Sequence, residues 1–182
     1  MKNHIIIRKK ISNFIKTLKI PGDKSISIRL ILLASLAIGK SKVFNLLESE
    51  DIKNTVKSMR KLGVKIKKIK QCYQINGLSL NGINLKKKIT VDAGNSGTFA
   101  RLFCGIVSGT DNKIKIIGDE SLSKRDFSRI IEPLQLFGVS FNSNNHKLPI
   151  ILAGTEFLRP IKYEEKKGSA QVKSAIMLAA LN

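Results

Sequence analysis

Cysteine, tryptophan and acidic residues are all scarce in this chain of 182 residues. The two cysteines, Cys72 and Cys104, lie in unrelated contexts, which excludes a zinc ribbon and a disulfide scaffold and favours a reducing, cytoplasmic environment. No apolar run approaches the roughly 20 residues that cross a membrane, and basic residues follow the short N-terminal apolar run instead of preceding it. We therefore expect neither a membrane span nor a secretory signal, and no metal site.

Positive charge is abundant, with 33 lysine and arginine residues against 13 acidic residues and a formal net charge of +20. Such a balance suits either a module that binds nucleic acid or a site for small anions. The lysines are spread along the chain, and tyrosine occurs only twice, so bases would find few aromatic side chains for stacking. We expect small anions as ligands and no nucleic acid, and we keep a basic nucleic-acid-binding module as an alternative.

A cycle of secondary-structure patterns recurs along the chain. The elements expected in the first cycle are a strand ending at Leu18–Ile20, an apolar helix over 26–38, an amphipathic helix over 51–62 with Asp51 as N-cap, strands at 64–66 and 73–75, and a turn at Asn76–Gly77. Those expected in the second are a strand at 89–91, an apolar helix at 99–107, a strand at 113–117, an amphipathic helix at 127–137 and a strand at 139–141. A third cycle begins with a strand at 148–152 and an apolar helix that runs to Leu181.

The three apolar helices begin at Ser25, Ser96 and Ser169, which are 71 and 73 residues apart. Strands that alternate with helices predict an α/β protein. The nearly equal spacing predicts repeated βαβαββ units around buried parallel helices. We expect the third unit to be truncated, because its second helix and closing strands would lie beyond Asn182.

Polar residues open each of the three apolar helices. Free backbone N–H groups and the positive end of the helix dipole attract anions at such starts. Serine at a helix start is also an ordinary cap, and only the repetition at matched spacing favours a shared ligand site. Pseudo-symmetry would bring the three starts to one end of the domain, together with basic side chains that bind carboxylate or phosphate. The candidate residues for a ligand with more than one anionic group are Lys24, Ser25, Arg29, Asn95, Gly97, Arg125, Ser169 and Gln171.

Four segments resemble, in order and spacing, the signatures of the 5-enolpyruvylshikimate-3-phosphate synthase (3-phosphoshikimate 1-carboxyvinyltransferase) family. These segments are Pro21–Arg29, Asp92–Leu102, Gly118–Arg125 and Gly168–Ala175, and the resemblance extends over about residues 14–182. It implies the enolpyruvyl transferase fold, in which residues 1–20 belong to a second domain and 21–182 form an incomplete first domain. It also implies a monomer that needs no metal or organic cofactor.

The resemblance implies transfer of the enolpyruvyl group of phosphoenolpyruvate to the 5-hydroxyl of shikimate 3-phosphate, a step of aromatic amino-acid biosynthesis. By position in the motifs, Ser25 and Arg29 hold shikimate 3-phosphate, Ser169 holds its phosphate, and Gln171 lies against its ring. Lys24 is expected to touch both substrates and is the one residue of this segment that we expect to take part in proton transfer.

Phosphoenolpyruvate is expected to bind the backbone of Gly97 and the guanidinium of Arg125, by the same resemblance. Because the motif keeps glycine at Gly97, the resemblance also implies that an active assembly is sensitive to glyphosate. The chain departs from the family at Ile28, where histidine is usual, and at Asp126, where proline is frequent. Neither position is a substrate contact in the pattern, so we do not expect these departures to affect binding.

Length is the larger departure, because members of the family have two domains of three such units each. The family's general acid and base and further arginines lie in the half that this sequence does not contain. We therefore expect the isolated chain to be inactive and to need a complementary C-terminal segment. The sister transferase that acts on UDP-N-acetylglucosamine remains an alternative, although its signature lacks the Asp23-Lys24-Ser25 and Arg29 arrangement.

Overall fold

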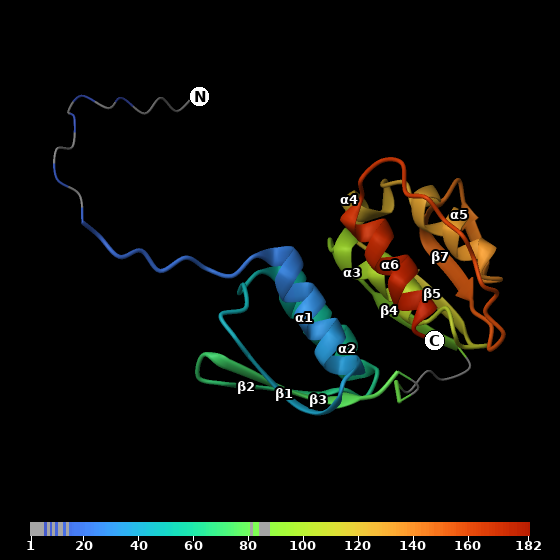
Figure 1. The fold of residues 1–182 in the computed structure, drawn as a ribbon, viewed down its shortest axis with the longest axis horizontal. Coiled ribbons are helices and arrows are strands. Elements are labelled where there is room, and N and C mark those ends of the chain that lie inside the picture. The colour runs from blue at the N-terminus through green and yellow to red at the C-terminus, as the bar shows by residue number, and fades with distance from the viewer. Residues whose placement is uncertain are drawn as a thin grey trace.

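The computed structural model describes residues 6, 8, 10, 13, 15–80, 82–83 and 88–182. It has the mixed α/β architecture that the sequence predicts (Figure 1). The helices within the described part of the chain are α1 (Lys24–Leu36), α2 (Glu50–Lys61), α3 (Gly97–Ile106), α4 (Glu120–Ser123), α5 (Ser128–Leu136) and α6 (Ala170–Ala180). The strands there are β1 (Ile38–Phe44), β2 (Lys65–Ile69), β3 (Cys72–Leu78), β4 (Lys88–Asp92), β5 (Lys113–Ile117), β6 (Ser140–Asn144) and β7 (Lys147–Ala153).

The two sheets share one topology. In the first, the strand order is β1-β3-β2 and all pairs are antiparallel. In the second, β5, β7 and β6 repeat this order and direction, and β4 adds a parallel partner beside β5. Helices follow the same sequence in both halves, so α1-β1-α2-β2-β3 corresponds to α3-β5-α5-β6-β7. Along β5 and β7, buried and exposed residues alternate, which is the pattern of a sheet with one face on the core.

Helices α1, α3 and α6 run in the same direction through the middle of the molecule (Figure 1). Their N-caps are Asp23, Ser96 and Ser169, and each cap side chain accepts from the backbone N–H three residues later. Successive caps are 73 residues apart, so the repeat is regular. Near their C-terminal ends, α3 and α6 are joined by the Asn182 amide, which donates to the Ile106 carbonyl at 3.4 Å.

Close contact between α3 and α6 depends on a glycine. A Cβ atom added at Gly105 would overlap the backbone carbonyl of Ala175. The buried faces of both helices are otherwise apolar and join the main core, with Phe99, Phe103 and Leu178 among its members. This packing fixes the relative positions of the two helix starts.

Two expectations about the first unit are wrong in detail. The cap of α1 is Asp23 and not Ser25, which lies inside the first turn. Both residues can cap a helix, and the Asp23 carboxylate accepts from Ile26 N at 2.8 Å. The cap position of α2 is Ser49 instead of Asp51, which lies in the first turn and forms an ion pair there.

The first unit also differs in its strands. Ile38 belongs to β1 and not to the first helix. Its side chain is 91% exposed, so it does not take part in the buried face that would favour a longer helix. Asn76 and Gly77 lie within β3 and not in a turn, because Gly77 packs against the Ala37 carbonyl. The turn between β2 and β3 lies at Lys70–Gln71, and Lys70 takes a left-handed φ of 52°.

The strand expected at Leu18–Ile20 is absent from the described residues 15–20, which have no regular secondary structure. Most of the segment before residue 15 lies outside the described residues. Within the described chain, no helix is both long enough and apolar enough to span a bilayer.

Candidate anion-binding site

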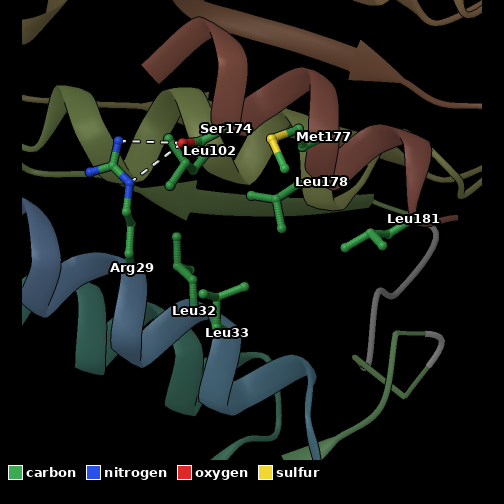
Figure 2. A pocket seen from close by; sticks show the side chains of 8 residues that line it. All are labelled: Arg29, Leu32, Leu33, Leu102, Ser174, Met177, Leu178 and Leu181. Atoms are coloured by element: carbon green, nitrogen blue, oxygen red, sulfur yellow. Dashed lines mark hydrogen bonds between the residues drawn. The ribbon is translucent and has the colours of Figure 1, made fainter. Parts of the chain in front are cut away.

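Arg29 links the start of α1 to the start of α6 (Figure 2). Its NH1 donates to the Ser25 carbonyl at 3.2 Å, and its NH2 donates to the Ala170 carbonyl at 3.4 Å. Its Nε and NH2 each lie 3.4 Å from Ser174 Oγ, one turn into α6. The half-buried guanidinium therefore lies between the starts of two helices, Lys24 and Ala170, that are 146 residues apart in sequence.

Lys24 adds a second positive charge at the start of α1. Its ammonium forms an ion pair of 3.0 Å with Asp51 of α2. The Lys24 side chain is 54% exposed, whereas Asp51 is 13% exposed. The ammonium is therefore the end of this ion pair that a ligand from solvent can reach.

The start of α3 is tied to the segment around α4. Asn95 Nδ2 donates to Asp119 at 2.6 Å, and Arg125 NH2 donates to Asn95 Oδ1 at 3.2 Å. Hydrogen bonds from the Leu122 N–H and the Asn95 amide hold the pKa of Asp119 below its ordinary value. Gly97 is buried in this corner, where an added Cβ would lie 3.3 Å from Arg125 NH1.

Gln171 links the starts of α6 and α3. Its Nε2 donates to Thr98 Oγ1 at 3.0 Å, and its Oε1 accepts from Arg101 NH1 at 3.2 Å. The neighbouring Ser169 hydroxyl accepts from Val172 N at 3.4 Å as the cap of α6.

The loop before α6 is held by a carboxylate. Glu165 accepts from the backbone N–H of Ser169 at 2.7 Å and forms an ion pair of 3.2 Å with Arg129 at the start of α5. The Glu165 side chain is only 8% exposed. These contacts fix the position of the Ser169 cap relative to the rest of the second unit.

The three polar helix starts thus lie together, as the repeat predicts. Hydrogen bonds through Arg29 and Gln171 connect α1 to α6 and α6 to α3, and Arg125 lies beside Asn95 at the edge of the group. All eight sequence-predicted residues belong to this region or to the elements that begin there. The ligands that each one contacts stay predictions.

Sequence reasoning missed Arg101 and Ser174. Arg101 is the single charged residue of helix α3. A lone charge in a mostly apolar helix indicates a residue with a specific polar partner, and the sequence alone shows that pattern. Ser174 looks like an ordinary small residue in a helix, and only the structure shows that it meets Arg29. Its contact depends on the angle between two helices that are distant in sequence.

An apolar groove of about 170 Å³ lies between α1 and α6, beside Arg29 (Figure 2). Leu33 and Met177 reach into it from the two helices and are 50% and 68% exposed. Helix α1 is therefore only partly buried, contrary to the expectation of an apolar helix enclosed on all sides. A groove lined almost wholly by carbon does not suit a polyanion, so the polar helix starts are the better candidate site.

One of the two cysteines is buried in a helix that begins at this site. Cys104 is fully buried in α3, and burial raises the pKa of its thiol to about 12. A thiol in that state is a packing residue and not a nucleophile. Across the described residues, no group of three or more His, Cys, Asp and Glu side chains is arranged to hold a metal ion.

The fold and the site define a class of α/β protein in which repeated units bring several polar helix starts and arginines together. The chain belongs to the EPSP synthase family, because the model of EPSP synthase (3-phosphoshikimate 1-carboxyvinyltransferase) matches residues 8–182. Among curated relatives, the 3-phosphoshikimate 1-carboxyvinyltransferase of Streptococcus mutans is 42% identical over 177 residues, which cover 96% of this chain and 41% of that protein. The corresponding protein of Ruthia magnifica is 47% identical over 165 residues, which cover 90% of this chain and 38% of that protein.

Solved structures agree with this assignment. An EPSP synthase from Acinetobacter baumannii superposes with a TM-score of 0.83 and 36% identity, over 90% of this chain and 37% of that chain. This chain thus spans 38–41% of the length of these curated relatives.

Proposed function

We propose that this chain supplies the shikimate 3-phosphate side of a 3-phosphoshikimate 1-carboxyvinyltransferase. The observation that carries the proposal is the hydrogen-bonded convergence of three helix starts through Arg29 and Gln171. The relatives' names support it, since they designate an enzyme whose two substrates, shikimate 3-phosphate and phosphoenolpyruvate, are both anions. The excess of basic residues favours the approach of such substrates.

Shikimate 3-phosphate binds, in this proposal, between the starts of α1 and α6. Arg29 and Ser25 lie on one side, and Ser169 and Gln171 lie on the other. Ser169 uses its oxygen as a cap acceptor, which leaves its hydroxyl proton to donate to a phosphate oxygen. The dipoles of two parallel helices add positive potential at the same place.

Phosphoenolpyruvate binds beside the start of α3. Gly97 offers its backbone where a side chain would crowd the guanidinium of Arg125, and Asn95 holds that guanidinium in place. Lys24 reaches both substrates from α1 after it leaves Asp51. A cation between two anionic ligands reduces their mutual repulsion.

The reaction forms a bond between the 5-oxygen of shikimate 3-phosphate and C2 of phosphoenolpyruvate and breaks the bond between C2 and the phosphate oxygen. The hydroxyl proton ends on the released phosphate or in solvent, so no oxidant or cofactor is required. Lys24 is the proton-transfer group that we assign in this chain. We assign the remaining acid and base groups to the part of the relatives that this chain does not span.

The proposal includes an arrangement of domains. Residues 1–20 belong to a second domain, and residues 21–182 belong to the first, which a C-terminal segment completes. The isolated chain then binds shikimate 3-phosphate without turnover, and the complete monomeric enzyme works in the cytoplasm.

Calorimetric titration of the chain with shikimate 3-phosphate tests the proposal. We expect saturable binding by the wild type and a loss of about tenfold or more in Arg29→Ala, because a charge-assisted hydrogen-bond partner is removed. Arg159→Ala is the matched control, since this exposed arginine lies beside the C-terminal end of α6 and loses the same charge. Equal affinities in the two variants, or no binding by the wild type, would contradict the proposal.

A further inference from the structure

Arg101 is a half-buried cation that forms no ion pair with the residues that the structure describes. Its guanidinium lies over the Phe127 ring, with Cζ 4.6 Å from the ring centroid, and its NH2 donates to the Asp126 carbonyl at 3.0 Å. Among the described residues, no carboxylate lies within ion-pair distance of Arg101. Burial and the nearby charge of Arg125 lower the pKa of Arg101 more than the charge of Asp126 raises it.

Such a placement costs stability. A half-buried cation beside a second cation loses hydration without gaining an ionic partner. Arg101 is the single charged residue of α3, and an uncharged side chain would pack on Phe127 at lower cost. The charge of Arg101 is therefore better explained by its contact with Gln171 than by the stability of the helix.

Gln171 is held at both ends of its carboxamide, by Thr98 at the nitrogen and by Arg101 at the oxygen. A reversed carboxamide would point its N–H groups at the guanidinium, where donor would face donor. Arg101 thus determines that the oxygen of the Gln171 carboxamide faces the guanidinium and that the nitrogen faces Thr98. The second N–H of Gln171 is the group that remains for a ligand at the helix starts.

We propose that Arg101 is a positioning residue that acts on shikimate 3-phosphate through Gln171, whose carboxamide it holds in a single orientation. This inference rests on the proposed function, in which Gln171 contacts that substrate. It goes further in one respect. Arg101 contributes to the affinity for shikimate 3-phosphate only while Gln171 is present.

A double-mutant cycle on shikimate 3-phosphate affinity, measured by calorimetry, tests this inference. Arg101→Met keeps most of the packing on Phe127 and removes the hydrogen bonds. We expect Arg101→Met and Gln171→Ala each to weaken binding about tenfold, the scale of one lost hydrogen bond to a charged group. The double variant should bind no more weakly than Gln171→Ala alone.

Arg29→Ala provides the contrast, because Arg29 is placed on the same substrate and hydrogen-bonds to Ser25, Ala170 and Ser174 instead of Gln171. Its effect should add to that of Gln171→Ala. Arg101→Lys is the second arginine variant, in case Arg101→Met does not fold. It keeps the charge but loses the planar fork, so we expect it to weaken binding and to show the same dependence on Gln171.

Three results would overturn the inference. Additive effects of Arg101→Met and Gln171→Ala would mean that Arg101 acts independently of Gln171. Wild-type affinity in Arg101→Lys would mean that charge alone matters. No binding by the wild type would overturn the proposed function and this inference together, whereas the first two results would leave the proposed function intact.

Discussion

Gln171 of α6 donates a hydrogen bond of 3.0 Å to Thr98 of α3, and each residue lies two positions after its helix cap. The two residues are 73 residues apart, which is the interval of the internal repeat. Equivalent positions of two repeat units therefore meet face to face. In the first unit the equivalent position is Ser25, whose carbonyl accepts from Arg29. The repeat thus brings chemically different side chains to one place and produces an asymmetric site from similar units.

Gly105→Ala should destabilise the chain by about 1–3 kcal/mol, because the added methyl group would overlap the Ala175 carbonyl and force α3 away from α6. Thermal or urea unfolding measures the change. Gly39→Ala is the control, since nothing lies within 4 Å of its Cβ and only the left-handed backbone is strained. A smaller loss in Gly105→Ala than in Gly39→Ala would show that the two helices are not in close contact there.

Gly97→Ala should leave stability nearly unchanged but reduce the affinity for phosphoenolpyruvate. Its Cβ would lie 2.5 Å from Arg101 NH1 and 3.3 Å from Arg125 NH1, and both atoms are at the ends of flexible side chains that can move. Unfolding and ligand titration separate the two effects.

In a complete, active assembly we expect glyphosate to inhibit the wild type, and an assembly indifferent to millimolar inhibitor would contradict this expectation.

The two thiols should differ in reactivity. Cys104 is buried and its pKa is raised to about 12, whereas Cys72 is partly exposed on β3. At pH 8 a thiol reagent should label Cys72 in the native chain and Cys104 only after unfolding. Mass spectrometry of the labelled peptides gives the result, and Cys72→Ser is the control that should abolish native labelling. Native labelling of Cys104 at a comparable rate would mean that α3 is not packed as described.

Acid should destabilise the folded chain, starting as the pH falls below about 4.5. Burial raises the pKa of Glu165, but hydrogen bonds from Ser169 N, Arg129 and Lys167 N outweigh it and leave the pKa below the ordinary value of 4.5. A carboxyl whose pKa is lower in the folded chain adds stability above its unfolded pKa. That stability is lost as the pH falls through the folded value.

Melting temperatures between pH 6 and pH 3 measure this effect. Glu165→Gln should melt at a lower temperature than the wild type at pH 6, and the difference should shrink towards pH 3. Glu50→Gln is the control, because Glu50 is an exposed carboxylate that pairs with Lys53. This substitution should change the melting temperature little at any of these pH values. A constant difference between Glu165→Gln and the wild type at every pH would rule out the ionised carboxylate as the cause.

Periodicity and cap residues predicted most of the helices and strands of the second unit, including Lys113–Ile117 as β5. The errors lie where two local signals compete. Asp23 and Ser25 can both cap α1, and Asn76–Gly77 resembles a turn although Gly77 serves a close strand–helix contact. Local sequence cannot decide such cases, because the neighbour that decides them lies elsewhere in the chain.

The candidate site was predictable to a similar degree. The three helix starts follow from the repeat, and their residues from the motifs. The partners of those residues do not follow, because Ser174 and Arg101 meet the site only through the packing of helices distant in sequence.

The central claim is that the starts of α1 and α6 hold one phosphorylated ligand between them. A titration with shikimate 3-phosphate, followed by ¹H–¹⁵N NMR of the whole chain, tests it most directly. The account predicts that backbone amides near Ser25 and Ser169 shift together along one saturation curve, while those of Lys65–Ile69 in β2 stay in place. Shifts confined to a single helix start, or different curves at the two starts, would contradict it.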